Sequence, residues 1–94
     1  SLSATHIYKG KGFVSVEVNQ LTILSCYISP NISHINFLAI WQEITEKAKA
    51  AEIKGNEVLI AGDLNAKSGL WGSPKEDPRG MTIAEWIMRE NYTV

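Results

Sequence analysis

Two apolar segments separated by a long amphipathic stretch constrain this chain most strongly. Residues 21–28 carry apolar side chains on both faces, which favours a strand inside a sheet. Residues 34–54 place apolar side chains at helical spacing, with polar side chains mostly between them. Residues 57–61 form a second short apolar run with β-branched residues, which ends at Gly62. Strands that alternate with a helix predict an α/β layered fold.

Weaker patterns place further elements around this centre. Residues 13–18 alternate between apolar and polar side chains, which predicts a half-buried strand. A last helix is expected from about Met81, with Thr82 and Glu85 at the spacing of a capping box. Residues 91–94 resemble the start of another strand. The apolar stripes expected on the two helices are Leu38, Trp41, Ile44, Ala48 and Ala51 on the first, and Ile83, Trp86 and Ile87 on the second.

Composition excludes several classes of protein. The 94 residues allow one small domain and no more, and the formal net charge of −1 gives no general attraction to polyanions. The single cysteine, Cys26, excludes an internal disulfide and a zinc cluster of cysteines, which favours a reducing compartment. No apolar run reaches the about 20 residues of a membrane span, so no membrane partner is expected.

Both ends of the sequence favour a piece of a longer protein. The chain begins with Ser1 rather than methionine, and it stops within the segment that resembles a new strand. Residues 1–12 are poorly patterned, and residues 9–12 (KGKG) predict a flexible, basic turn. We therefore expect a fragment of a larger domain.

A carboxylate and an amide follow the strand predicted at residues 57–61. If the chain remains extended there, Asp63 and Asn65 point the same way and converge on one spot. Together they would hold a water or hydroxyl and orient it toward an electrophile. Residues 62–65 (GDLN) also suit a plain turn, because Asp and Asn bond their own backbone. Loops beyond the carboxyl ends of strands are where α/β sheets bind ligands, so both interpretations are kept.

Tyr27 lies near the end of the strand predicted at residues 21–28. In a parallel sheet two such strands can end on the same side, which would bring the Tyr27 hydroxyl into the site of Asp63. There it would hydrogen-bond a phosphate oxygen. The alternative is a core tyrosine with its hydroxyl at the rim. His6 and His34 have no partner carboxylate at a recognisable spacing, so neither is assigned a catalytic role.

The loop expected over residues 62–80 is long for a compact domain. Loops of this length are usually functional or disordered, and Leu70 and Trp71 argue against disorder. Trp71 would either stack on a nucleic-acid base or pack and pin the loop. Three cations in the loop would either reach phosphate oxygens or form a solvated surface balanced by Glu76 and Asp77; they are Lys67, Lys75 and Arg79.

Several of these segments, taken in order, resemble the endonuclease/exonuclease/phosphatase superfamily. Residues 25–31 (SCYISPN), the amphipathic helix and residues 58–67 (VLIAGDLNAK) carry the general resemblance. A second set of residues narrows the resemblance to one group within the superfamily: residues 70–73 (LWGS) and 77–80 (DPRG), followed by the helix with Glu85 and Trp86. The ordered set resembles the target-nicking endonuclease domain of non-LTR retrotransposons.

The resemblance implies a DNase-I-like four-layer αββα sandwich that cleaves DNA phosphodiesters with Mg²⁺. Residues 1–94 would be the middle segment of that domain, arranged as strand, strand, helix, strand, long loop and helix. Asp63 would orient the attacking water, and Asn65 would help hold the water and the scissile phosphate. Tyr27 would contact the phosphate or support the transition state. The residues that the resemblance places near DNA are Arg79, Trp71 and Lys67. It also implies an intracellular, nuclear protein, with a reverse transcriptase domain in a longer parent.

The chain departs from the family pattern at both ends. No segment before Tyr27 matches the family's asparagine and metal-binding glutamate, and the Ser-Asp-His-type segment of the last strands is not reached. Asp63 alone would then hold Mg²⁺ weakly and indirectly. We therefore expect the isolated chain to be inactive and to leave an apolar sheet face open. The alternatives are a catalytically dead remnant or binding module, and a phosphatase of the same superfamily.

Overall fold

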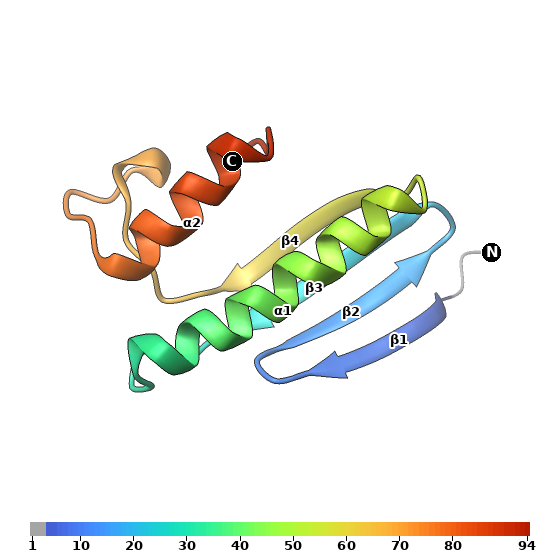
Figure 1. Ribbon diagram of the computed structural model, residues 1–94, viewed down its shortest axis with the longest axis horizontal. Helices are drawn as coiled ribbons and strands as arrows, with labels where there is room; N and C mark the ends of the chain where they lie inside the picture. The colour runs from blue at the N-terminus through green and yellow to red at the C-terminus, as the bar shows by residue number, and fades with distance from the viewer. Residues whose placement is uncertain (1–3) are drawn as a thin grey trace. The chain divides into compact units, whose positions relative to one another are not determined.

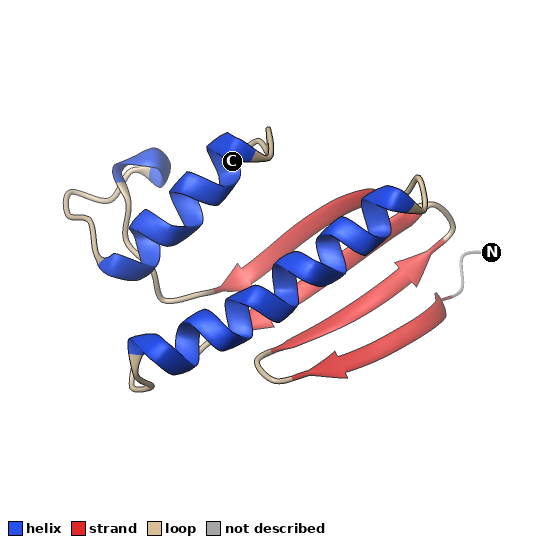
Figure 2. Ribbon diagram, in the orientation of Figure 1, coloured by secondary structure: helices blue, strands red, loops and turns tan. Residues whose placement is uncertain are grey.

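The computed structural model describes residues 4–94, which divide into two compact units, one that ends at Leu64 and one that spans Asn65–Val94. The first unit holds a sheet and a long helix, and the second holds a loop and a shorter helix (Figures 1 and 2). This content confirms the predicted α/β class and is consistent with a partial DNase-I-like domain. Among the described residues, no helix is both long enough and apolar enough to cross a membrane.

The first unit is built on a four-stranded sheet with the order β1-β2-β3-β4. β1 (Ala4–Gly10), β2 (Phe13–Val18) and β3 (Leu21–Tyr27) pair antiparallel in succession. β4 (Glu57–Asp63) pairs parallel with β3, after a crossover through α1 (His34–Ile53). The parallel pair requires such a crossover, because strands that run the same way cannot be joined by a tight turn. The predicted strand at residues 21–28 is thus confirmed as an interior strand.

Helix α1 covers one face of this sheet and closes the core (Figure 1). Leu24 and Ile28 on the sheet side are essentially inaccessible to solvent. The predicted stripe is correct at four positions but wrong at Leu38, which is 40% exposed. Because the residues on both sides of Leu38 are also apolar, the helical period alone does not decide which of them faces the sheet. The residues that α1 buries are Phe37, Ile40, Trp41, Ile44, Ala48 and Ala51.

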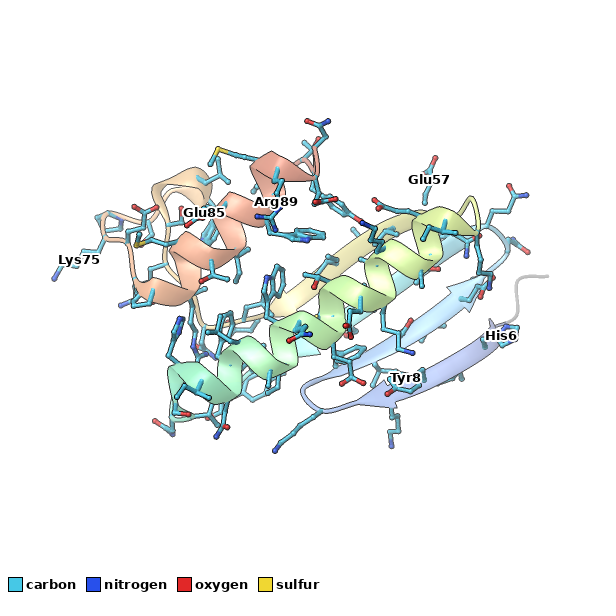
Figure 3. The ribbon with its side chains drawn as sticks, in the orientation of Figure 1. His6, Tyr8, Glu57, Lys75, Glu85 and Arg89 are labelled. Carbon is cyan, nitrogen blue, oxygen red and sulfur yellow. The ribbon has the colours of Figure 1, made fainter. Side chains whose placement is uncertain are left out.

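Strand β1 lies in the segment that the sequence left unpatterned. It is an edge strand, and its large apolar side chain Ile7 is 67% exposed. The Tyr8 side chain of β1 contacts two residues of α1. Its hydroxyl donates to Glu43 Oε2 at 2.5 Å, and Lys47 Nζ lies 3.9 Å from the centroid of the Tyr8 ring. The labelled Tyr8 side chain extends toward α1 in Figure 3. This hydrogen bond is the main reason that the pKa of Tyr8 is raised above its ordinary value.

In the second unit, α2 (Pro78–Arg89) begins earlier than predicted. Asp77 caps it, so the capping box expected from Thr82 and Glu85 is wrong; the Thr82 hydroxyl instead donates to the carbonyl of Pro78 at 3.0 Å, inside the helix. The strand start expected at residues 91–94 is also wrong, because no strand forms there. The Tyr92 ring instead packs 4.4 Å from the Trp86 ring, measured between centroids.

Candidate functional site

The candidate site lies where the parallel strands β3 and β4 end. Tyr27 and Asp63, the last residues of the two strands, are direct partners in the parallel register. Neighbouring strands lie about 4.8 Å apart, so the backbones that carry these two side chains are close together. The backbone N–H of Ile28 donates to the Asp63 carbonyl at 3.0 Å, which extends the pairing past the strand ends. Both side chains are exposed, and the expected meeting of the two strand ends is confirmed.

The sequence predicts that the strand ends at Gly62, and this prediction is wrong. Gly62 lies within β4, pairs with Cys26 and has a φ of 122°. A Cβ atom at this position would lie 2.0 Å from the Cys26 carbonyl oxygen, so only glycine fits between the strands. Asp63 is therefore held by the sheet ladder itself, and the carboxylate belongs to a strand rather than to a loop.

The chain is not extended beyond Asp63. Asn65 has a φ of 50°, in the left-handed region that asparagine tolerates better than most residues. The predicted convergence of Asp63 and Asn65 requires an extended chain between them, and the chain is not extended there. The plain turn suggested for residues 62–65 does not form either, because Gly62 and Asp63 belong to β4, and the role of Asn65 at a phosphate stays a prediction.

The long loop of the second unit is organised by Asp77. Asp77 Oδ1 accepts hydrogen bonds from the backbone N–H groups of Gly80, at 2.7 Å, and Lys67, at 3.1 Å. Burial works to raise the pKa of this carboxyl, but the two backbone donors, together with nearby cations, hold the pKa below its ordinary value. In the sequence, Asp77 is interpreted as a balancing charge and as part of residues 77–80, and not as a helix cap. An aspartate directly before a proline at a helix start is the signal that identifies the cap.

The loop residues predicted to meet DNA differ in exposure. The Trp71 indole N–H donates to the Ala66 carbonyl at 3.2 Å, and this hydrogen bond links two parts of the same loop. Lys67 is exposed, whereas Arg79 is only 7% exposed. The labelled Lys75 extends away from the loop in Figure 3. Contact of Trp71, Lys67 and Arg79 with DNA stays a prediction.

The donor set at the strand ends fits no complete metal site. Within residues 4–94, no group of three or more His, Cys, Asp or Glu side chains could hold a metal ion. Asp63 supplies a carboxylate of the kind that Mg²⁺ prefers, but a protein site normally adds substrate phosphate and water to it. Cys26, next to this edge, is buried, and burial raises the pKa of its thiol to about 11, so it is no nucleophile at neutral pH.

Comparisons with known proteins agree with these features. A family model described as endonuclease-reverse transcriptase matches residues 21–94, which include α1, both parallel strands and the capped loop. The RNA-directed DNA polymerase from mobile element jockey of Drosophila melanogaster is 26% identical over 85 residues. That match covers 84% of this chain but only 9% of the length of the jockey protein. No solved structure gave a significant match.

Proposed function

Since the chain belongs to the endonuclease-reverse transcriptase family, we propose that it is part of a retrotransposon endonuclease that hydrolyses DNA phosphodiesters. The observation that carries this proposal is the pairing of Tyr27 with Asp63 at adjacent strand ends. A carboxylate and a hydroxyl at adjacent strand ends are suited to handle a nucleophilic water and the phosphate that it attacks. The similarity to the jockey protein supports a retrotransposon origin.

Asp63 accepts a hydrogen bond from the attacking water and directs the water's lone pair at phosphorus. Tyr27 donates its hydroxyl hydrogen to a non-bridging phosphate oxygen, where negative charge builds up in the transition state. The sheet ladder fixes both Cα positions, so the two groups need little rearrangement when substrate binds. In this proposal Asn65 helps to hold the water and the phosphate.

Mg²⁺ would supply charge neutralisation at the phosphate, with Asp63 as a weak and indirect ligand. Because this donor set is incomplete, we propose that residues 1–94 alone do not nick DNA. Trp71, Lys67 and Arg79 contribute to DNA binding in this proposal, which also includes a reverse transcriptase domain in a longer parent and a nuclear location. A catalytically dead remnant that only binds, and a phosphatase of the same superfamily, are the competing functions.

The test is nicking of supercoiled plasmid with Mg²⁺ by a polypeptide that extends this chain at both ends. Asp63→Asn removes the charge that directs the water and is expected to slow nicking by about 10²-fold to 10⁴-fold. Glu57→Gln is the matched control, because Glu57 begins the same strand and lies at its opposite end (Figure 3). Equal nicking by Asp63→Asn and the parent polypeptide would contradict the proposal. Release of phosphate from monoesters without nicking would favour the phosphatase.

A further inference from the structure

The basic turn between β1 and β2 reaches the same end of the sheet as Tyr27 and Asp63. The backbone N–H of Tyr27 donates to the Gly12 carbonyl at 2.9 Å, and the N–H of Ile28 donates to the Asp63 carbonyl at 3.0 Å. Two successive hydrogen bonds therefore join the turn, the end of β3 and the end of β4. Figure 1 shows the turn at the end of the sheet where β3 finishes.

We propose that this turn, through Lys11 and its neighbour Lys9, binds the phosphate backbone of duplex DNA beside the Tyr27–Asp63 site. This inference rests on the proposed function, since it names a further contact to the same substrate. Neither lysine belongs to the segment that resembles the family, and the antiparallel pairing of β1 with β2 is what brings them to the site.

The turn is held firmly enough to present its charge at a fixed place. A Cβ atom on Gly12 would lie 3.1 Å from Ile40 Cγ2 and 3.6 Å from Ile28 Cγ1, so the turn backbone rests on the apolar core. Phe13, which follows directly, is buried and anchors the first residue of β2. The flexible part is thus the lysine side chain alone, which suits a phosphate whose position varies with DNA sequence.

The positive charges of the turn are not neutralised by ion pairs within the described part of the chain. Two other lysines of this unit are engaged: Lys54 Nζ lies 2.7 Å from Glu17 Oε1, and Lys47 lies over the Tyr8 ring. Within residues 4–94, Lys9 and Lys11 form no ion pair, and Lys11 is exposed. An ammonium group is a point charge that binds phosphate without reading bases, so the contact positions DNA rather than selecting its sequence.

The experiment measures binding of the full 94-residue chain to a fluorescein-labelled DNA duplex, by anisotropy at several salt concentrations. Removing one lysine that binds a phosphate reduces the slope of log K against log salt by about 0.9, which is about eightfold weaker binding at 0.1 M salt. Lys11→Gln is expected to show this reduction, and Lys9→Gln/Lys11→Gln about twice the change in slope. Circular dichroism checks that each variant folds as the parent chain does.

Lys49→Gln is the matched control for net charge. Lys49 is exposed on α1, 15 residues after His34 and about 22 Å along the helix from the end where β3 finishes. Its substitution is expected to leave the slope unchanged. An equal change in slope for Lys49→Gln and Lys11→Gln would overturn the inference, because only net charge would then matter.

The remaining outcomes separate the inference from the function on which it rests. Binding by the parent chain with an unchanged slope in Lys11→Gln would overturn the inference and leave the proposed function standing. No salt-dependent binding of duplex DNA by the parent chain would count against DNA as the substrate, and the inference would fall with it. Tighter binding to an RNA duplex of the same sequence would overturn the assignment of DNA.

Discussion

Replacing Gly62 by alanine should destabilise the first unit by about 4 kcal/mol. The backbone conformation at this φ of 122° costs a residue with a side chain about 1–3 kcal/mol. The added Cβ would lie 2.0 Å from the Cys26 carbonyl oxygen, whereas real contacts of this kind stay above 3.0 Å. Separating β3 and β4 by about 1 Å would break the adjacent ladder hydrogen bonds, each worth about 1 kcal/mol. The sum is a large part of the about 5–15 kcal/mol that a domain has in total.

Gly55→Ala is the control that separates backbone conformation from contact. Gly55 follows α1 with a φ of 90°, but a Cβ atom there would meet nothing within 4 Å. Its substitution should therefore cost only about 1–2 kcal/mol. Urea unfolding followed by circular dichroism measures both values, and the difference of about 2–3 kcal/mol separates the midpoints by roughly 1–2 M.

A Gly62→Ala variant that is at least as stable as Gly55→Ala would contradict this explanation. The close approach of β4 to β3 at Cys26 would then not depend on glycine. Asp63 would also lose the explanation given for its fixed position, because the strand that carries it would tolerate a side chain at the preceding residue.

Two further substitutions test the cap of α2 and the buried face of α1. Asp77→Ala should cost about 1–2 kcal/mol at pH 7, measured by urea unfolding, because the carboxylate caps the helix. The lowered pKa of Asp77 means that its contribution is complete above the ordinary pKa of aspartate and disappears as pH falls through the folded-state value, so the variant should lose less stability than the parent on acidification. Phe37→Ala should cost about 3–5 kcal/mol because Phe37 is fully buried, whereas Leu38→Ala should cost much less. Equal destabilisation at Phe37 and Leu38, or an unchanged acid profile in Asp77→Ala, would contradict the packing and capping described above.

The elements with strong local patterns were predictable from the sequence. Residues 13–18 alternate cleanly and form β2, and the run from Leu21 is apolar on both faces and forms the interior strand β3. The helix expected over residues 34–54 matches α1 closely, since its period persists over many turns. The candidate pair Tyr27 and Asp63 followed from these elements, because parallel strands that end together bring their last residues together.

What escaped prediction depends on contacts between distant residues. The sequence of β1 shows no alternation of apolar and polar side chains that would predict a strand. The partner of Tyr8 in this strand is Glu43, which lies 35 residues away on a helix. The sequence predicts a strand end at Gly62, because the fit of this glycine against Cys26 exists only once the two strands pair. The start of α2 was misplaced because Thr82 and Glu85 had the spacing of a cap, while Asp77 makes the actual hydrogen bonds.

The central claim is that the ends of β3 and β4 form one phosphodiester-cleaving site. A double-mutant cycle of Tyr27→Phe and Asp63→Asn, read as plasmid nicking with Mg²⁺ by the polypeptide extended at both ends, tests it most directly. If both groups act on one phosphate, the double variant should be about as slow as the slower single variant, as is found for residues that act as a unit. Rate reductions that simply multiply, or nicking unaffected by either substitution, would contradict the account.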